Sequence, residues 1–372
     1  MTSQPASTTS WDSLAQSIAD GEAVLILGPD AIPRYPAGQD SAGVETSFSQ
    51  LSRQVIQQTP GIGINYFYDR DRLFLFRDAE SKMLARKVVR DLARDPGWLP
   101  DEELLRQIVA MPFHLVLSLS PDRAVYDAFC RYTTAPQFDF VSPYGKLPGA
   151  PISEPTAHNP LVFNLCGNVL DKRDSPILDY FDLFQLVIKL LGNSDEIPTW
   201  LGRKLREADT YILLGFQFDK WYSQLFLHYL NWLDNNAVAN INRNFPILSD
   251  VSDDERAFIL NQFNVQQVAP ERSDFDALYA ACARKGILRD IRDPLSPVQA
   301  QVRMLIGQDK LDEALRMLEQ FNSPDIDLLK SRYQHWKQQQ RAGTADSRDL
   351  ALEINRIRYA LLTYNSQTET NV

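Results

Sequence analysis

Four short apolar runs, each ended by a glycine, a proline or a small polar residue, most constrain what this chain can fold into. The first run, Ala23–Leu27, stops at Gly28 and Pro29, as a buried strand does at a tight turn. Three later runs end in a similar way: His114–Ser120, Leu161–Leu165 and Thr210–Leu214. Because ligands of open α/β sheets lie outside the carboxyl ends of parallel strands, the turn at Gly28 is the first place to expect a bound nucleotide.

Segments with helical spacing of apolar residues alternate with these strands. The predicted helices cover residues 11–19, 47–58, 79–92, 123–131, 180–191, 200–207, 220–233, 254–263 and 275–283, and further strands are expected at 245–248 and 265–268. Strands rich in Val, Ile and Leu that alternate with helices are typical of a parallel sheet covered on both faces. The sequence therefore predicts an α/β fold with a doubly wound, Rossmann-like parallel sheet.

Two stretches between these elements have less regular patterns. Residues 29–45 contain three prolines and two glycines, which predicts a loop over the strand end. Residues 66–68 and 73–76 are rich in aromatic side chains. Since aromatic residues are usually buried, these two stretches are interpreted as core that packs against helices.

The pattern changes at Asp293–Pro297, where two prolines suggest a hinge. Beyond it, apolar residues recur at helical spacing in segments punctuated by Gly307, Pro324 and Gly343, which predicts a small all-α bundle. The expected organisation is therefore a disordered N-terminus at 1–10, a nucleotide-binding domain at 11–292 and a helical domain at 297–372. Acidic and basic residues balance in the helical domain, so the α/β part carries the whole net charge of −10.

Composition and charge exclude several classes of protein. A net charge of −10 makes nucleic acid an unlikely general partner. No apolar run is long enough for a membrane span, and the polar N-terminus lacks a signal-peptide core, so a cytoplasmic protein is expected. The three cysteines, Cys130, Cys166 and Cys282, are far apart, which argues against a disulfide framework or a zinc cluster.

The order of the strand ends resembles that of bacterial sirtuin-like domains, the silent-information-regulator type. Leu25–Ala31 stands where that family has its Gly-Ala-Gly nucleotide loop, and His114–Asp122 resembles its strand ending in Thr-Thr-Asn-Tyr-Asp. Val162–Gly167 is similar to its strand ending in Leu-His-Gly, and Leu213–Asp219 to its Phe-Leu-Gly-Tyr-Ser strand and turn. The resemblance covers about residues 11–285.

This resemblance implies binding of NAD or an ADP-ribose-like nucleotide and, in bacterial defence proteins, often NAD cleavage. The matching cofactor-binding positions are Gly28, Pro29, Asp30, Ala31, Ser120, Asp122, Cys166, Gly167, Gly215, Phe216 and Asp219. The family's catalytic Asn and His are replaced by Ser120 and Cys166. Losing a positioned general base typically costs about 10²–10⁴ in rate, so the replaced positions imply a catalytically degenerate site. No metal is expected, since the three cysteines are too far apart for a zinc cluster. Pro29 also removes a backbone N–H that a phosphate loop would use.

Several of these positions also have a purely structural interpretation. Asp30 suits a turn, and Asp122 and Asp219 suit the N-caps of the helices that follow them. Cys166 is either a nucleophile with a stabilised thiolate or a buried, inert thiol. His158 is either a substitute base for a rearranged site or a surface loop residue next to Asn159 and Pro160.

Asp309–Leu315 and Glu353–Ile357 are similar to the effector-associated adaptor domains of bacterial conflict systems. This similarity implies a protein partner, itself another helical adaptor, bound through 297–372.

Three functions follow as hypotheses. The first hypothesis is an NAD-binding, catalytically degenerate protein of such a defence system, which also forms homo-oligomers. The second is an active NAD glycohydrolase with a rearranged site that uses Asp122, Cys166 or His158. The third is an oligomeric scaffold with an empty cleft.

Overall fold

The computed structural model divides the chain into two compact units. It describes residues 11–37, 46–132, 136–144, 152–171, 174–191, 199–216, 220–232, 247–248, 268–269, 272–291, 301–302, 304–306, 310–319, 324–342, 350, 353–354, 356–358, 360–361 and 364. One unit comprises residues 1–126 and 134–290, and the other comprises 127–133 and 291–372. The predicted disordered N-terminus at 1–10, the helix at 254–263, the hinge at 293–297 and Asp219 lie outside the described residues.

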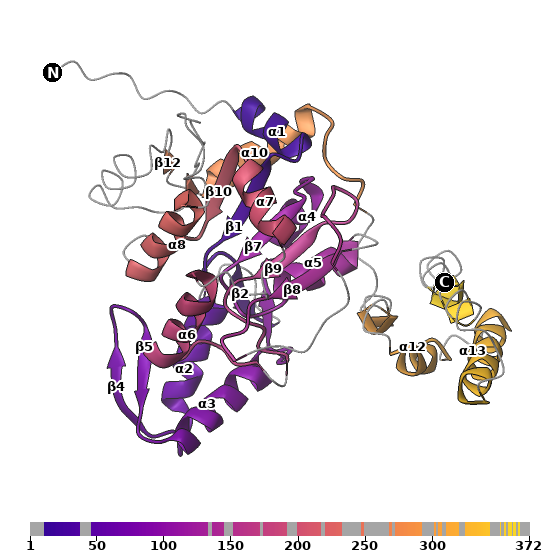
Figure 1. Cartoon of the computed structure of the whole chain (residues 1–372), viewed down its shortest axis with the longest axis horizontal. Helices are drawn as coiled ribbons and strands as arrows, with labels where there is room; N and C mark the ends of the chain where they lie inside the picture. Colours follow the sequence, from indigo (N-terminus) through magenta and orange to yellow (C-terminus); the bar gives the residue numbers. More distant parts are fainter. Residues whose placement is uncertain are drawn as a thin grey trace. The chain divides into compact units, whose positions relative to one another are not determined.

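A parallel sheet forms the centre of the first unit (Figure 1). Its strand order is β12-β11-β10-β1-β7-β9-β8, and neighbouring strands pair in parallel. The bounds are β1 Ala23–Leu27, β7 Leu115–Ser118, β8 Gln137–Phe140, β9 Leu161–Asn164, β10 Thr210–Leu214, β11 Ile247–Leu248 and β12 Val268–Ala269. The chain moves outward from β1 on one side and returns to β10 on the other, so the predicted Rossmann-like α/β architecture is confirmed.

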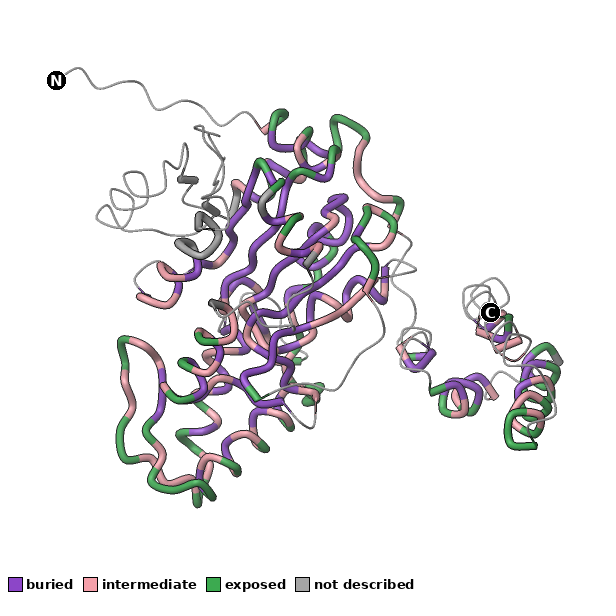
Figure 2. Tube along the Cα trace, viewed as in Figure 1, coloured by how far each residue is buried: buried purple, intermediate pink, exposed green. Residues whose placement is uncertain are grey.

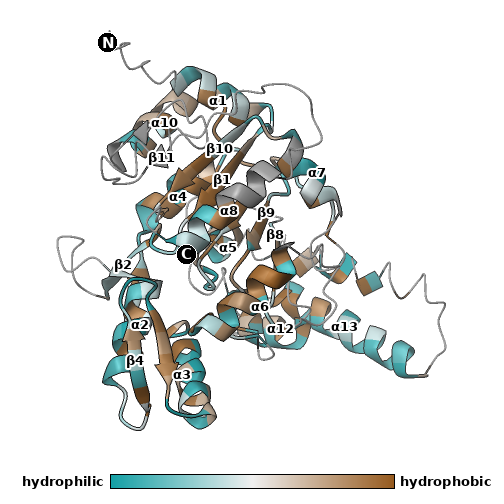
Figure 3. Ribbon diagram, turned by 60° about the vertical axis from the view of Figure 1, so that its left-hand side comes forward, coloured by the Kyte–Doolittle hydropathy of each residue, from teal (hydrophilic) through white to brown (hydrophobic). Residues whose placement is uncertain are grey.

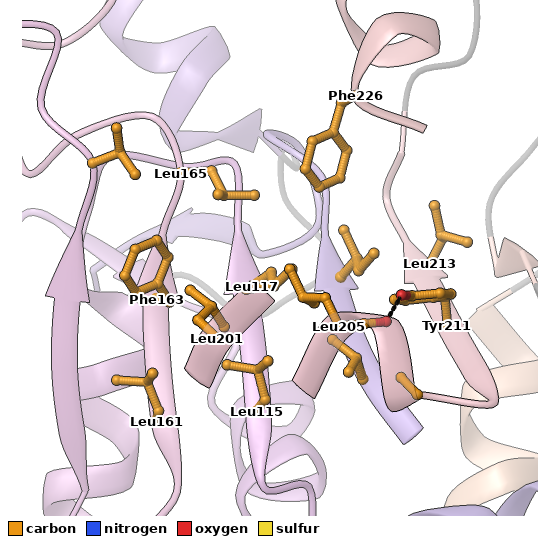
Figure 4. Packing of buried hydrophobic residues seen from close by; sticks show 14 of the residues in the cluster. Leu115, Leu117, Leu161, Phe163, Leu165, Leu201, Leu205, Tyr211, Leu213 and Phe226 are labelled. Atoms are coloured by element: carbon orange, nitrogen blue, oxygen red, sulfur yellow. Dashed lines mark hydrogen bonds between the residues drawn. The ribbon is translucent and has the colours of Figure 1, made fainter. Parts of the chain in front are cut away.

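The strands are apolar on both faces because both faces are covered. On one face Leu117, Phe163 and Tyr211 pack against Leu201 and Leu205 of helix α7 (Thr199–Glu207), and the Tyr211 hydroxyl donates to the carbonyl of Leu205 (Figure 4). The alternate strand residues Leu25, Val116, Val162 and Ile212 are equally buried. Figure 2 shows this burial along the whole length of the central strands, as expected for a sheet between two helical layers.

The helices of this unit begin where the sequence places capping residues. Helix α2 (Phe48–Gln58) begins with a capping box, in which the Ser47 hydroxyl accepts from the Gln50 amide and the Gln50 side chain accepts from the Ser47 amide. Asp78 and Asp101 cap α3 (Ala79–Leu92) and α4 (Glu102–Ala110). The remaining described helices of this unit are α1 Trp11–Ala19, α6 Tyr180–Leu191, α8 Trp221–Trp232 and α10 Arg272–Arg284, and α5 spans Ala124–Tyr132.

The predictions for residues 29–45 and for the two aromatic stretches were partly wrong. Part of the expected loop forms β2 (Pro33–Pro36), which pairs antiparallel with β3 (Thr46–Ser47) and β6 (Trp98–Pro100). The aromatic stretches are the strands of a hairpin, β4 (Ile64–Tyr68) and β5 (Leu73–Phe76). Phe74 is buried, but Tyr66 is 58% and Leu75 46% exposed, because alternate residues of a hairpin face solvent.

Hydropathy separates the central sheet from its surroundings. In Figure 3 the strands β1, β9 and β10 are brown, whereas much of α3 is teal. Strand β8 and helix α4 were not predicted from the sequence. Strand β8 alternates polar and apolar residues at the edge of the sheet, so it lacks the continuous apolar run of the inner strands.

The second unit is helical where it is described. It contains α12 (Leu311–Leu318) and α13 (Pro324–Ala342), with further helical residues between 301 and 306 and between 353 and 364. Leu315, Leu318, Ile326 and Leu361 belong to one buried apolar cluster. Tyr333 and Trp336 stack in parallel with ring centroids 5.8 Å apart. The cluster draws on helical segments over the whole of this part of the chain, so the unit has a hydrophobic core of its own.

Candidate functional site

The four predicted strand ends lie side by side at one edge of the sheet. Strands β10, β1, β7 and β9 are consecutive neighbours, and all four are parallel. Their carboxyl ends carry the turns at Gly215, Gly28, Ser120 and Cys166 respectively. The strand order reverses between β1 and β10, and ligands of doubly wound sheets bind at such a reversal.

The turns after β1 and β10 are packed directly on each other. A Cβ atom on Gly28 would lie 1.8 Å from the carbonyl oxygen of Gly215, and one on Gly215 would lie 2.4 Å from the Cα of Ala31. Gly215 has a φ of +64°, a conformation that favours glycine. Glycine is therefore required at both positions for close backbone packing, and these backbones touch each other directly.

A cavity of about 140 Å³ lies beside these turns, displaced toward β7 and β9. Pro29, Leu119, Pro121 and Cys166 contribute the strand-end side of its wall. Helix α2, the β4–β5 hairpin, the segment before α6 and the beginning of α8 supply the rest: Phe48, Ser49, Ser52, Arg53, Ile56, Asp71, Arg72, Leu73, Phe74, Val89, Pro176, Ile177, Leu178, Leu183, Tyr222 and Ser223. An apolar pocket with a few polar groups is the usual form of a small-molecule site.

Two arginines line this cavity, and their surroundings differ. Arg72 donates to Asp30 at 2.9 Å, and its own backbone has a φ of +56°, which is uncommon for a residue other than glycine. Arg53 donates through Nη1 to the Ser49 hydroxyl at 2.7 Å. Burial and then the charge of Arg72 lower the pKa of Arg53 to about 10, so it remains a cation at neutral pH. Asp30 is therefore held by an ion pair rather than left as a simple turn residue.

Asp71 gives the cavity wall an acceptor that is only half used. The Tyr180 hydroxyl donates to its Oδ2 atom. The Oδ1 atom is buried and has no hydrogen-bond partner among the described residues. A buried carboxylate oxygen without a donor costs free energy, and such groups in native structures often mark ligand sites.

Cys166 and Ser120, at the two positions where the resemblance implies catalytic residues, are not set up for chemistry. Burial, with a smaller effect of the Asp174 charge, raises the pKa of the Cys166 thiol to about 12, so the thiol is protonated at neutral pH. Ser120 lies between two residues of the cavity wall, and its Oγ atom is buried with no hydrogen-bond partner among the described residues. His158 is exposed and is not among the residues of the cavity wall.

The other predicted site residues have packing roles in the described structure. Asp122 pairs with Arg34 at 3.0 Å in a buried ion pair and accepts from the Ala124 amide at the beginning of α5. A Cβ on Gly167 would lie 2.5 Å from Asp174, and Phe216 is buried against Phe226. Pro29 and Cys166 thus face the cavity, whereas Gly28, Ala31 and Gly215 form the packed turns.

Sequence reasoning missed the groups on the far side of the cavity. Arg53 lies on a helix whose other residues alternate between polar and apolar, and Arg72 follows a run of charged residues at the hairpin turn. Neither arginine carries a local signal that separates it from a surface arginine. Within the described ranges, no cluster of three or more His, Cys, Asp or Glu side chains is placed to hold a metal ion.

The described part of the chain contains no helix that is both long and apolar enough to cross a bilayer.

The comparisons with known proteins bear on the C-terminal part of the chain. No curated protein matches the sequence. Residues 298–369 match the family model of effector-associated domain 11. This match supports the predicted effector-associated domain in the C-terminal part of the chain.

Proposed function

We propose that the chain is a sirtuin-like protein of a bacterial conflict or antiphage defence system that binds NAD or an ADP-ribose-like nucleotide without cleaving it. The effector-associated match supports the system to which it belongs. The observation that carries the ligand-binding half is the cavity at the carboxyl ends of β1, β7 and β9. The raised pKa of the Cys166 thiol and the ion pair of Asp122 favour binding over catalysis.

Calorimetric titration of the full chain with NAD and with ADP-ribose tests ligand binding. Cys166→Leu adds bulk to the cavity wall and should weaken binding at least about tenfold, since one misplaced apolar group is worth about 1.4 kcal/mol or more. Cys282→Ala, which changes a buried cysteine of α10, is the matched control and should bind as the parent does. Absence of heat with either nucleotide at millimolar concentration would remove the nucleotide from the proposal.

A fluorescent NAD-analogue assay separates this proposal from an NAD glycohydrolase with a rearranged site. No turnover is expected from the full chain, with or without its partner. Turnover that is lost in Cys166→Ala or Asp122→Ala would show that the site is catalytic and that the alternative is correct.

The second part of the proposal is that the C-terminal unit recruits a protein with another helical adaptor domain. An open hollow of about 570 Å³ on this unit, lined in part by His335, Trp336 and Glu353, offers a surface for such contact. Co-purification with effector-associated proteins encoded beside this chain tests the proposal. His335→Glu should abolish capture, whereas Gln338→Glu, on the same helix but outside the hollow, should not.

The oligomer is the third part of the proposal. Light scattering of the full chain with and without nucleotide should show a homo-oligomer. Assembly that proceeds without nucleotide, together with a cavity that binds none, would favour the scaffold over the nucleotide-binding protein.

A further inference from the structure

Among the described residues, the Arg53 guanidinium in the wall of this cavity has no opposite charge at contact distance. Its hydrogen bond goes to the neutral hydroxyl of Ser49. Its neighbour Arg72 is already paired with Asp30. A guanidinium has several N–H donors in one plane, so most of those on Arg53 remain available to an occupant of the cavity.

The free-energy cost of leaving Arg53 without an ion pair indicates the charge that a ligand of the cavity carries. Arg53 is half-buried in a largely apolar wall, where a cation is costly unless it is paired or hydrogen-bonded. The nearby positive charge of Arg72 adds to the cost and, with burial, lowers the pKa of Arg53, while the charge of Asp30 offsets part of this effect. An anion beside Arg53 would relieve both effects, and a guanidinium binds a carboxylate through two parallel hydrogen bonds.

The size and lining of the cavity indicate the rest of the ligand. Its volume of about 140 Å³ is close to that of an engineered apolar cavity, roughly 150 Å³, which binds benzene. Phe48, Ile56, Phe74 and Leu183 supply an apolar lining. This space fits a single ring, so it holds at most one ring of a larger ligand such as a dinucleotide.

We propose that the cavity binds a small aromatic monoanion, with its ring among Phe48, Ile56 and Phe74 and its anionic group on Arg53. The inference rests on the ligand binding proposed above but not on that ligand being a nucleotide. It narrows the class of occupant to an aromatic ring that carries one negative charge. The unsatisfied Oδ1 of Asp71, on the same wall, supplies an acceptor for a hydroxyl or amino substituent on that ring.

Thermal unfolding of the full chain with benzoate tests the proposal, and benzamide serves as the neutral molecule of the same shape. Benzoate at ten times its Kd should raise the Tm by about 2–4 °C, while benzamide and inorganic phosphate should have no such effect. Arg53→Met should weaken benzoate binding at least about tenfold, because the charge-assisted hydrogen bonds are lost. Arg203→Met is the matched control, since Arg203 forms an exposed ion pair with Glu154 and lies outside the cavity wall.

Three results would overturn the proposal: no response to benzoate at tens of millimolar, an equal response to benzamide, or an unchanged response in Arg53→Met. If Arg53→Met does not fold, Arg53→Lys replaces it, and the two-point contact should then be lost with a several-fold weaker Kd. Benzoate binding without any response to NAD or ADP-ribose would support this inference and contradict the nucleotide proposal.

Discussion

At the scale of single residues, the cavity wall combines side chains whose ordinary chemistry has been suppressed. The Cys166 thiol is held protonated by burial, and Asp122 is committed to Arg34. Arg53 and Asp71, by contrast, face the cavity with hydrogen-bonding capacity left. These side chains therefore favour recognition of a ligand over its chemical conversion.

The first prediction concerns the reactivity of Cys166. Because burial raises the pKa of its thiol to about 12, alkylation by iodoacetamide should be slow at pH 7.5 and should accelerate as the pH rises toward 10. Peptide mapping by mass spectrometry measures the rate at this cysteine. Rapid modification at neutral pH would show a stabilised thiolate and would restore Cys166 as a nucleophile.

The second prediction concerns His114, whose ring packs against Gly21. Burial, followed by the charges of Lys204 and Arg289, lowers the pKa of His114 to about 4. The folded state therefore binds fewer protons than the unfolded state between about pH 6.5 and 4, and stability should fall as the pH falls through this window. Since His114 is partly exposed to solvent, we discount the effect to about 1–2 kcal/mol.

Urea unfolding at pH 7 and at pH 4.5 measures this effect. His114→Asn has no charge at either pH, so its loss of stability on acidification should be smaller than that of the parent by about 1 kcal/mol. Equal pH dependence in the two proteins would contradict the prediction.

At the scale of elements, the ends of β1 and β10 are joined through their turns, and the β4–β5 hairpin and α2 close the cavity beside them. The turns after β1 and β10 pack on each other through Gly28 and Gly215, and the Gly28 amide donates to the Leu214 carbonyl at 2.8 Å. The hairpin and α2 then provide the opposite wall of the cavity. Pro29, which follows Gly28 in the first of these turns, belongs to the cavity wall.

Alanine substitutions at two glycines test this contact. Gly215 and Gly286 have nearly the same positive φ, +64° and +67°, but a Cβ on Gly286 would meet nothing within 4 Å. Gly286→Ala should cost about 1 kcal/mol in the free energy of unfolding, which is the cost of the backbone conformation alone. Gly215→Ala should cost at least about 2 kcal/mol more, because its Cβ would overlap the backbone of Ala31. Urea titrations that give equal losses would refute the close packing of the turns.

At the scale of the whole molecule, two units with separate cores share one chain. The apolar cluster around β1 and β7 and the cluster around Leu315 have no residue in common. For the adaptor function proposed above, the C-terminal unit must fold independently of the unit that contains the cavity. Separate cores meet that need.

Leu315→Ala should therefore destabilise the second unit alone. Truncation of a buried leucine costs about 2–5 kcal/mol. Hydrogen exchange of the full chain should show faster exchange of the amides in α12 and α13 and unchanged exchange in β1 and β7. The reciprocal change, Val116→Ala, should accelerate exchange in the sheet and leave α12 unchanged. Accelerated exchange in both units after either substitution would show that they unfold together.

The sequence predicts those parts of the fold that depend on residues close together in the chain better than those that depend on distant contacts. The inner strands and α1, α3 and α6 were predicted with nearly the observed bounds, since their apolar periodicity is a local property. The match to effector-associated domain 11 confirms the interpretation of the tail as that kind of domain. The edge strand β8 and the hairpin were missed or misread, because their residues are only half buried and the pattern is weak.

The candidate site divides in the same way. The sequence by itself determined that four strands end in turns, and parallel pairing then requires those ends to share one edge of the sheet. Only the tertiary structure decided that Gly28 and Gly215 close on each other and that the cavity lies toward β7 and β9. It alone brought Arg53 and Asp71 to the wall of that cavity, because contacts between elements distant in the chain depend on packing, which no local pattern of residues records.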